Sequence, residues 1–313
     1  MNIIFFSPSF NTGQWIQGIK ARLPDAKVRA WVSGDNAPAD YALVWHPPYE
    51  MLAGRKDLKG IFVLGAGVDV ILRQELENPG MLSADVPLIR LEDTGMARQM
   101  QEYTVNAVLY YFRRMDEYRR NQERRIWHPL EQHNRKEFVI GVLGVGVLGR
   151  SVLEKLKEFD FAVRCWSRTA KQLDGVESFA GEGQFGEFLS GCQVLINLLP
   201  DTPETRAILN ISTFSQLKKG AYIINIARGA HLVEQDLLTA IDKNYVAGAT
   251  LDVFAIEPLS TMHPFWTHPR ITVTPHIAAN TIPEQAMDSV CENIQRMEQG
   301  ESAKGLVNIS LGY

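Results

Sequence analysis

FVIGVLGVGVLG, residues 138–149, joins a short apolar strand to a glycine-rich turn and the start of a helix, and this stretch decides the fold. Its glycines have the spacing of a dinucleotide-binding turn. Gly144 allows the tight turn, Gly146 lets a pyrophosphate approach the backbone, and Gly149 lets the helix lie close to the strand. The free N–H groups at the start of the helix would then face the phosphates. A strand–turn–helix that binds no ligand is the alternative. The residues of the turn that we predict to bind the cofactor are Gly144, Gly146, Val147, Leu148 and Gly149.

The composition of the chain narrows the class of protein. Its 313 residues suit two domains, and 45% hydrophobic and 22% charged residues are ordinary for a globular protein. A net charge of -4 gives no reason to expect a nucleic-acid or membrane partner. The three cysteines, Cys165, Cys192 and Cys291, lack the spacing of a disulfide framework or a metal site, so we expect no metal and a reducing compartment. We find neither a signal-peptide pattern nor an apolar run long enough to cross a bilayer, and we therefore expect a cytoplasmic protein.

The N-terminal third of the chain alternates between apolar β-prone runs and helical patterns, which predicts a parallel sheet in an α/β unit. A helix is predicted next, over 96–122. Its second half is rich in arginine, but Arg113 and Glu117, like Asp116 and Arg120, are four residues apart, as on a solvated, ion-paired helix face. We therefore do not expect nucleic acid to bind there. The strands predicted in the N-terminal unit are 2–8, 28–32, 41–45, 60–67 and 86–91.

The alternation becomes regular after residue 138 and predicts a complete dinucleotide-binding domain with six strands. A last amphipathic helix, 283–297, lies too late in the sequence to belong to this sheet, so we expect it to return to the N-terminal unit. We therefore predict an α/β fold in which a Rossmann dinucleotide-binding domain, 103–283, is inserted in a smaller flavodoxin-like α/β substrate domain formed by 1–102 and 284–313. The six strands are predicted at 138–143, 161–166, 193–198, 221–226, 248–253 and 271–274.

The end of the second strand of this domain favours NADPH over NADH. A protein that binds NADH usually has a carboxylate here, about 20 residues after the glycines, for the ribose 2′-hydroxyl. The sequence has RCWSRT at 164–169 instead, with no carboxylate. The hydroxyl groups of Ser167 and Thr169 and the guanidinium of Arg168 suit a 2′-phosphate. The alternative is that Arg168 is a surface arginine on a loop.

Three polar residues follow the late strands of the predicted sheet: Arg228 in NIARG, Glu257 in LDVFAIEP and His276 in TPHIAAN. Because ligands bind at the carboxyl ends of parallel strands, we expect these side chains to converge beside the glycine turn. Reduction of a 2-keto acid needs a proton donor, and histidine is the side chain best suited to this near neutral pH. The Glu257 carboxylate would favour the imidazolium, and Arg228 would bind the substrate carboxylate with two hydrogen bonds. Each residue alone could be structural, but the set indicates hydride transfer to a keto acid.

With these motifs together, the chain resembles the D-isomer-specific 2-hydroxyacid dehydrogenases over nearly its whole length. The resemblance implies catalytic roles for Arg228, Glu257 and His276, and it implies that the turn at Ala66 and Gly67 binds the substrate carboxylate. It also implies a homodimer joined through the cofactor domains. Further cofactor contacts are implied for Leu199, Pro200, Thr205, Ala227 and Asp252. The segments that carry the resemblance are GVLGVGVLG (141–149), LINLLPDTPETR (195–206), INIARG (224–229), LDVFAIEP (251–258) and TPHIAAN (274–280).

Within the family, the chain is most similar to the branch that reduces glyoxylate and hydroxypyruvate with NADPH, NADH being the weaker cofactor. This implies reduction of glyoxylate to glycolate and of hydroxypyruvate to D-glycerate. Bulky Trp45 beside the substrate turn and Trp266 before the last strand would keep the pocket small, the alternative for each being core packing. A reductase of larger 2-keto acids and a nucleotide-sensing, corepressor-like binding protein on the same fold are the alternatives. One position departs from the family pattern, since Ala279 stands where a glycine is common. The segments that indicate the branch are WHPP (45–48), LGAGVD (64–69), LEDTGM (91–96) and RCWSRT (164–169).

Overall fold

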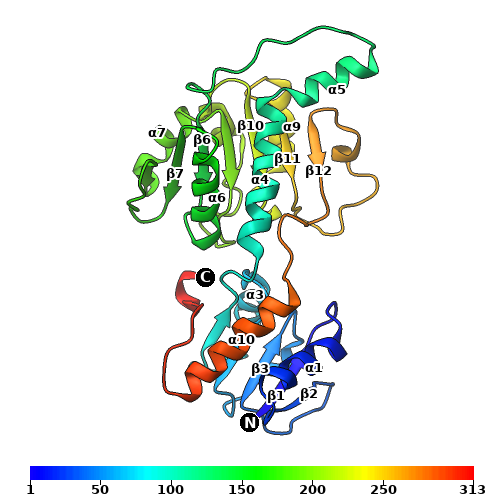
Figure 1. The fold of residues 1–313 in the computed structure, drawn as a ribbon, viewed down its shortest axis with the longest axis vertical. Helices are drawn as coiled ribbons and strands as arrows, with labels where there is room; N and C mark the ends of the chain where they lie inside the picture. The colour runs from blue at the N-terminus through cyan, green and yellow to red at the C-terminus, as the bar shows by residue number, and fades with distance from the viewer. The chain divides into compact units, whose positions relative to one another are not determined.

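The computed structural model describes all 313 residues, which form two compact units (Figure 1). Residues 1–96 and 281–313 make the first unit, and residues 97–280 make the second. Each unit is built on one parallel sheet. None of the helices has both the length and the apolar character needed to cross a membrane.

The first unit has a five-stranded sheet with the flavodoxin-like order β2-β1-β3-β4-β5. Its central strands are buried on both faces, which explains continuous apolar sequences such as YALV in β3 and GIFV in β4. The strands are β1 (Asn2–Phe6), β2 (Lys27–Ala30), β3 (Tyr41–Val44), β4 (Gly60–Val63) and β5 (Leu88–Arg90). The helices are α1 (Thr12–Arg22), α2 (Tyr49–Leu52), α3 (Asp69–Glu77) and α10 (Pro283–Glu298), with a short 3-10 helix at Ile309–Leu311.

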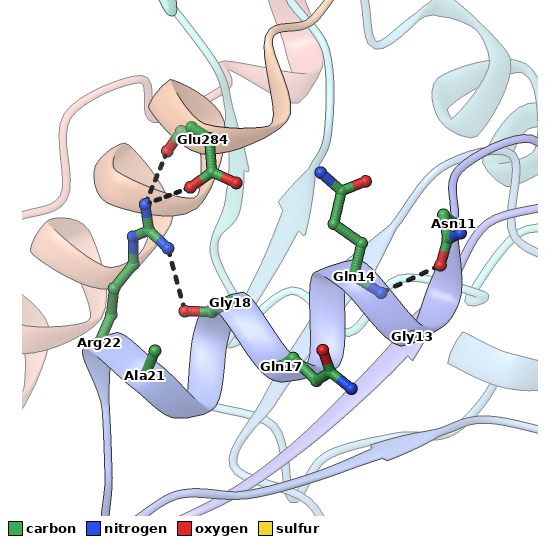
Figure 2. A pocket seen from close by; sticks show the side chains of 8 residues that line it. All are labelled: Asn11, Gly13, Gln14, Gln17, Gly18, Ala21, Arg22 and Glu284. Atoms are coloured by element: carbon green, nitrogen blue, oxygen red, sulfur yellow. Dashed lines mark hydrogen bonds and ion pairs between the residues drawn. The ribbon is translucent and has the colours of Figure 1, made fainter.

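Helix α10 packs on α1 and so returns the end of the chain to this first unit. Gly18 of α1 leaves room for Met287, because a Cβ at Gly18 would lie 2.3 Å from the Met287 sulfur. At the rim of this contact, Arg22 donates from Nη2 to Glu284 Oε2 at 2.8 Å (Figure 2). The buried apolar residues of α10 are Ala286, Met287, Val290, Cys291 and Ile294.

The second unit has a seven-stranded parallel sheet with the order β12-β11-β10-β9-β6-β7-β8. Counted from β6, this is the Rossmann order 3-2-1-4-5-6 with one strand added, so the predicted α/β class and Rossmann domain are confirmed. The strands are β6 (Ile140–Leu143), β7 (Val163–Ser167), β8 (Glu177–Ala180), β9 (Val194–Asn197), β10 (Ala221–Asn225), β11 (Val246–Leu251) and β12 (Ile271–Val273). The helices are α4 (Met96–Phe112), α5 (Met115–Glu123), α6 (Val147–Lys157), α7 (Phe185–Ser190), α8 (Ile211–Gln216) and α9 (Glu234–Asp242), with 3-10 helices at Glu182–Gln184, Gly229–His231 and Pro264–Thr267.

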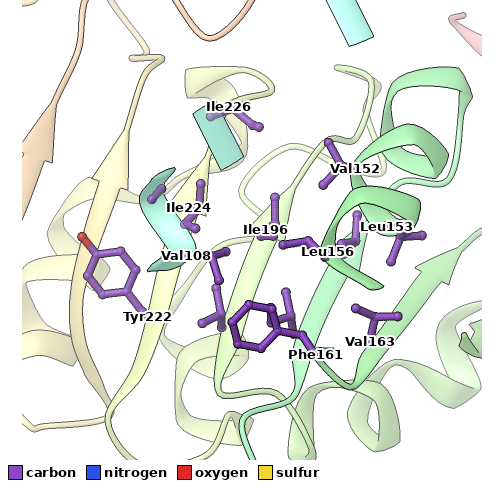
Figure 3. Packing of buried hydrophobic residues seen from close by; sticks show 14 of the residues in the cluster. Val108, Val152, Leu153, Leu156, Phe161, Val163, Ile196, Tyr222, Ile224 and Ile226 are labelled. Carbon is purple, nitrogen blue, oxygen red and sulfur yellow. The ribbon is translucent and has the colours of Figure 1, made fainter. Parts of the chain in front are cut away.

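Alternate residues of the central strands enter two different cores, one on each face of this sheet. Ile196 and Ile224 pack with α4 and α6 in one core, where Val108 and Leu156 are buried with them (Figure 3). The neighbours in sequence belong to the opposite core, which contains residues of α7, α8 and α9. This period of two in strands covered on both faces fixes the direction in which every strand-end residue points.

Two predictions for this unit were wrong. The sheet has a seventh strand, β8, at the edge beside β7, and its sequence ESFA buries only Phe179, so no apolar run marks it. The helix predicted over 96–122 is two helices, because Arg114 takes a left-handed backbone with a φ of 58° between α4 and α5. Glu117 consequently pairs with Arg114, at 2.7 Å from Nε to Oε1, instead of with Arg113.

Candidate active site

The turn between β6 and α6 requires glycine at the positions where the sequence has it. Gly144 has a φ of 93°, in the left-handed region that glycine tolerates. A Cβ at Gly149 would lie 2.0 Å from the Gly144 carbonyl oxygen, so α6 can approach the turn only without a side chain there. Gly146 is exposed, and a Cβ there would meet nothing within 4 Å, which leaves its backbone open to a ligand. Helix α6 begins with neither an acidic residue nor a side-chain cap, so its first N–H groups suit an anion.

The predicted 2′-phosphate residues follow β7 at the same edge of the sheet. Ser167, the last residue of β7, is buried, and its Oγ donates to the Thr169 carbonyl oxygen at 2.8 Å. This hydrogen bond holds the loop that presents Arg168, which is exposed together with Thr169. The Ser167 hydroxyl therefore shapes the loop, while the guanidinium of Arg168 lies at the surface.

Strands β9 and β10 end side by side and lead to the Leu199–Pro200 turn and to Arg228. Arg228 is half-buried, and its Nη1 donates to the Ala227 carbonyl oxygen at 2.7 Å. A Cβ at Gly229 would lie 1.8 Å from the Phe254 carbonyl carbon, so the loop that carries Arg228 packs directly on the backbone that follows β11. This contact brings the ends of β10 and β11 together.

His276 and Glu257 form a hydrogen-bonded pair beyond the ends of β12 and β11. His276 Nδ1 lies 2.8 Å from Glu257 Oε2, with the side chains 45% and 36% exposed. Burial acts to raise the pKa of Glu257. The hydrogen bonds from His276 and from the Phe254 N–H lower the pKa, as do the charges of His276 and Arg228, and together they outweigh burial. The pKa of Glu257 is therefore below its usual value. An ionised carboxylate can only accept, so Nδ1 carries a proton and Nε2 remains the atom that can exchange one.

The loop that carries His276 is fixed by the buried carboxylate of Asp252. His276 itself has a φ of 55°, a left-handed conformation that is costly for a residue with a side chain. Asp252 Oδ1 accepts from the Ile277 N–H and from Thr274 Oγ1, at 2.8 and 2.6 Å, and Oδ2 accepts from the Ala278 N–H at 2.8 Å. Both carboxylate oxygens are thus engaged in holding the backbone on either side of His276.

Sequence reasoning missed two residues of this network. The hydroxyl of Tyr103, on α4, lies 2.6 Å from Thr274 Oγ1, which in turn donates to Asp252. Because Thr274 donates to Asp252, the Tyr103 hydroxyl must donate to Thr274. Burial raises the pKa of Tyr103 to about 12, which keeps this donor protonated. The apolar neighbours of Tyr103 in α4 made it look like an ordinary core residue, and only its hydroxyl could have indicated a second role.

The predicted substrate turn, Ala66 and Gly67, belongs to the first unit, where it follows β4 and precedes α3. The backbone N–H groups of Ala66 and Gly67 make no hydrogen bond within the chain. The ring of Trp45 lies against Gly65, where a Cβ would be 2.4 Å from it, and stacks on Phe10 with 6.0 Å between ring centroids. Trp45 therefore packs directly behind a turn with free N–H groups.

Comparisons with known proteins find relatives that match the chain in sequence and in fold. The family model described as D-isomer specific 2-hydroxyacid dehydrogenase, NAD binding domain, matches residues 105–278. The glyoxylate/hydroxypyruvate reductase A of Photorhabdus laumondii is 65% identical over 313 residues, which is 100% of both chains.

Solved structures give the same result. A D-isomer specific 2-hydroxyacid dehydrogenase from Xanthobacter autotrophicus, in complex with NADPH and MES, has a TM-score of 0.92 at 36% identity, covering 100% of this chain and 99% of the other. The NADPH-dependent glyoxylate/hydroxypyruvate reductase of Sinorhizobium meliloti, in complex with NADP and sulfate, has a TM-score of 0.89 at 31% identity with the same coverage.

Proposed function

This chain belongs to the D-isomer-specific 2-hydroxyacid dehydrogenases, and we propose that it uses NADPH to reduce glyoxylate to glycolate and hydroxypyruvate to D-glycerate. The observation that carries the proposal is the His276–Glu257 pair, 2.8 Å apart, at the sheet edge that also presents Arg228 and the glycine turn. The sequence similarity to reductases of these two acids over the whole chain supports the choice of substrates.

The residues of the second unit fit a dinucleotide phosphate. The open backbone at Gly146 and the uncapped start of α6 suit the pyrophosphate, and the exposed Arg168 suits a 2′-phosphate. The Leu199–Pro200 turn and Ala227 follow the neighbouring strands and would line the nicotinamide end. When bound, NADPH supplies the hydride that the carbonyl carbon of the keto acid receives.

Each member of the polar set has a distinct task in this reduction. Arg228 pairs with the carboxylate of the keto acid and polarises the adjacent carbonyl. The imidazolium of His276 gives its Nε2 proton to the ketone oxygen, which becomes the hydroxyl of the product. Glu257 holds Nδ1–H at 2.8 Å and stabilises the positive ring before the proton leaves. In the first unit, the N–H groups of Ala66 and Gly67 make no hydrogen bond within the chain and would suit a carboxylate, and Trp45 behind that turn would favour small acids.

The assembly and location follow from other features of the chain. We propose a homodimer joined through the second unit, which is supported by the exposed segment after α5, where Trp127 is 100% and Ile126 48% exposed. Light scattering coupled to gel filtration would test the dimer.

We also propose that the protein works in the cytoplasm, where its three unpaired, buried cysteines would stay reduced. Cell fractionation would test that placement.

The test of the function is a substrate panel. NADPH oxidation is measured with glyoxylate, hydroxypyruvate, pyruvate and phenylpyruvate, and repeated with NADH. We expect glyoxylate and hydroxypyruvate, with NADPH as the cofactor, to give the highest kcat/KM. Higher kcat/KM with phenylpyruvate would favour the reductase of larger acids instead. His276→Gln should keep NADPH binding and lose turnover, and unchanged turnover would show that another group supplies the proton.

A further inference from the structure

A buried polar cluster joins the two loops that the proposed function assigns to the nicotinamide and to the substrate. Asn197 and Asn225 are the last residues of β9 and β10 and are register partners in the sheet. His231, at the end of the 3-10 helix that follows Arg228, is hydrogen-bonded to Asn197, and all three residues are 0% exposed. Asn197 Nδ2 donates to Asn225 Oδ1 at 3.0 Å and to His231 Nδ1 at 2.8 Å. Three polar side chains buried this deeply must satisfy one another.

The hydrogen bonds fix the protonation of the His231 ring. Its Nε2 lies 3.1 Å from the Pro200 carbonyl oxygen and 3.3 Å from Thr205 Oγ1. A carbonyl can only accept, so Nε2 carries the proton and donates to Pro200. Nδ1 is then the acceptor for Asn197. The neutral ring thus donates on one side and accepts on the other.

The same side chains hold the backbone of both loops. On the β9 side, Asn197 Oδ1 accepts from the Leu199 N–H at 3.2 Å. On the β10 side, Asn225 Oδ1 accepts from the Ala227 N–H at 3.3 Å, and Asn225 Nδ2 donates to the Arg228 carbonyl oxygen at 3.1 Å. The His231 N–H also donates to the Arg228 carbonyl oxygen, at 3.3 Å. His231 therefore binds the Leu199–Pro200 turn through its ring and the Arg228 carbonyl oxygen through its backbone N–H.

We propose that His231 is a positioning residue that sets the Leu199–Pro200 turn and the Arg228 loop relative to each other. The inference rests on the proposed function, which places the cofactor at the first loop and the substrate carboxylate at the second. His231 is buried and acts only through these loops. Its Nε2–H fixes the cofactor side through Pro200, and its Nδ1 fixes the substrate side through the two asparagine amides.

Two substitutions separate the two sides of the ring. His231→Asn places an amide oxygen near the position of Nδ1, so it keeps the acceptor for Asn197 and loses the donor to Pro200. His231→Gln places an amide nitrogen near the position of Nε2, so it keeps the donor to Pro200 and loses the acceptor for Asn197. We expect His231→Asn to raise the Kd for NADPH about tenfold with little change in the KM for glyoxylate, since one hydrogen bond is lost. We expect His231→Gln to raise the KM for glyoxylate by about the same factor and the Kd for NADPH by a smaller factor, because Asn197 holds Asn225 on the Arg228 side and also the Leu199 N–H.

Two further variants separate this role from general stability. Tyr222→Phe removes another buried hydroxyl in the same sheet, 3.0 Å from Thr250 Oγ1, and should lower the unfolding temperature without changing Kd or KM. Thr205→Val changes a partly buried residue whose Oγ1 donates to the Pro200 carbonyl oxygen at 2.7 Å. It should resemble His231→Asn, and it provides the test if a substitution at His231 prevents folding.

The measurements are NADPH fluorescence titration for Kd, NADPH oxidation for KM and kcat, and thermal unfolding for stability. A larger rise in the Kd for NADPH in His231→Asn and a larger rise in the KM for glyoxylate in His231→Gln support the inference. If both variants resemble Tyr222→Phe, or if both change Kd and KM by the same factors, His231 does not link the loops. The inference then fails, and the proposed function is unaffected. If the wild-type chain neither binds NADPH nor oxidises it with any keto acid, the proposed function fails and the inference with it.

Discussion

Replacing Asp252 by asparagine tests how the structure holds His276. The carboxylate is 0% exposed and accepts three hydrogen bonds, two of them from the backbone N–H groups of Ile277 and Ala278. An amide has one accepting oxygen, and that oxygen can lie on only one of these two sides. Whichever way the amide turns, its NH₂ group faces one of the two N–H groups, which is then left without an acceptor.

A buried donor without a partner costs about 1–3 kcal/mol, and loss of the charge weakens the bonds that remain, so we expect Asp252→Asn to lower the free energy of unfolding by roughly 3 kcal/mol. For a unit of this size the unfolding temperature should fall by roughly 6–12 °C. The loop would also release His276 from its φ of 55°, and turnover should fall by at least about tenfold, more than NADPH binding weakens.

The assays are urea unfolding, NADPH titration and steady-state turnover. Asp236→Asn is the matched control, because Asp236 accepts from the Ile211 N–H at 2.9 Å in the same unit, away from the candidate site. It should lose about 1 kcal/mol of stability and keep its turnover. If Asp252→Asn is as stable as the wild type within about 0.5 kcal/mol, the network does not hold the loop. If the Kd for NADPH rises while turnover at saturating NADPH is normal, Asp252 acts on the cofactor and not on His276.

Three other substitutions test the site. Arg168→Ala should raise the KM for NADPH by about tenfold or more and leave the KM for NADH unchanged, and equal effects on both would exclude a 2′-phosphate contact. Arg228→Lys should lower kcat/KM for glyoxylate about 100-fold, since an ammonium cannot form two parallel hydrogen bonds to a carboxylate; unchanged kinetics would place the substrate elsewhere. Glu257→Gln should lower kcat for glyoxylate, because the neutral amide cannot stabilise a positive charge on the ring that it contacts; unchanged kcat would show that the carboxylate is not needed. The pKa of Glu257 is lowered in the folded chain, so the stability that its charge contributes is complete above the ordinary pKa of 4.5 and is lost as the pH falls through the lower folded value. The free energy of unfolding of Glu257→Gln and of the wild type, measured at about pH 7 and pH 4, should therefore differ less at the lower pH. A difference that stays constant would contradict this origin.

The sequence by itself determined the class of fold and the approximate ends of the strands that precede the predicted site residues. Strands covered on both faces are continuous apolar runs, and the glycine turn is defined by local sterics, so both can be recognised without knowing what lies next to them. The position of Arg228, Glu257 and His276 at one edge of the sheet could also be predicted from the sequence, since each follows a strand and parallel strands end at the same edge.

The tertiary structure decided the features that depend on distant partners. β8 is a strand only because β7 offers it an edge, and α4 ends at Phe112 because Arg114 takes a left-handed backbone and binds Glu117. Tyr103 belongs to the His276 loop only because α4 passes close to Thr274, 171 residues later in the chain. His231 likewise acquires its acceptor and its donor from residues at the end of β9 and beyond it. Local sequence encodes backbone preference and burial, whereas a buried polar group takes its role from the hydrogen-bond partner that the fold brings to it.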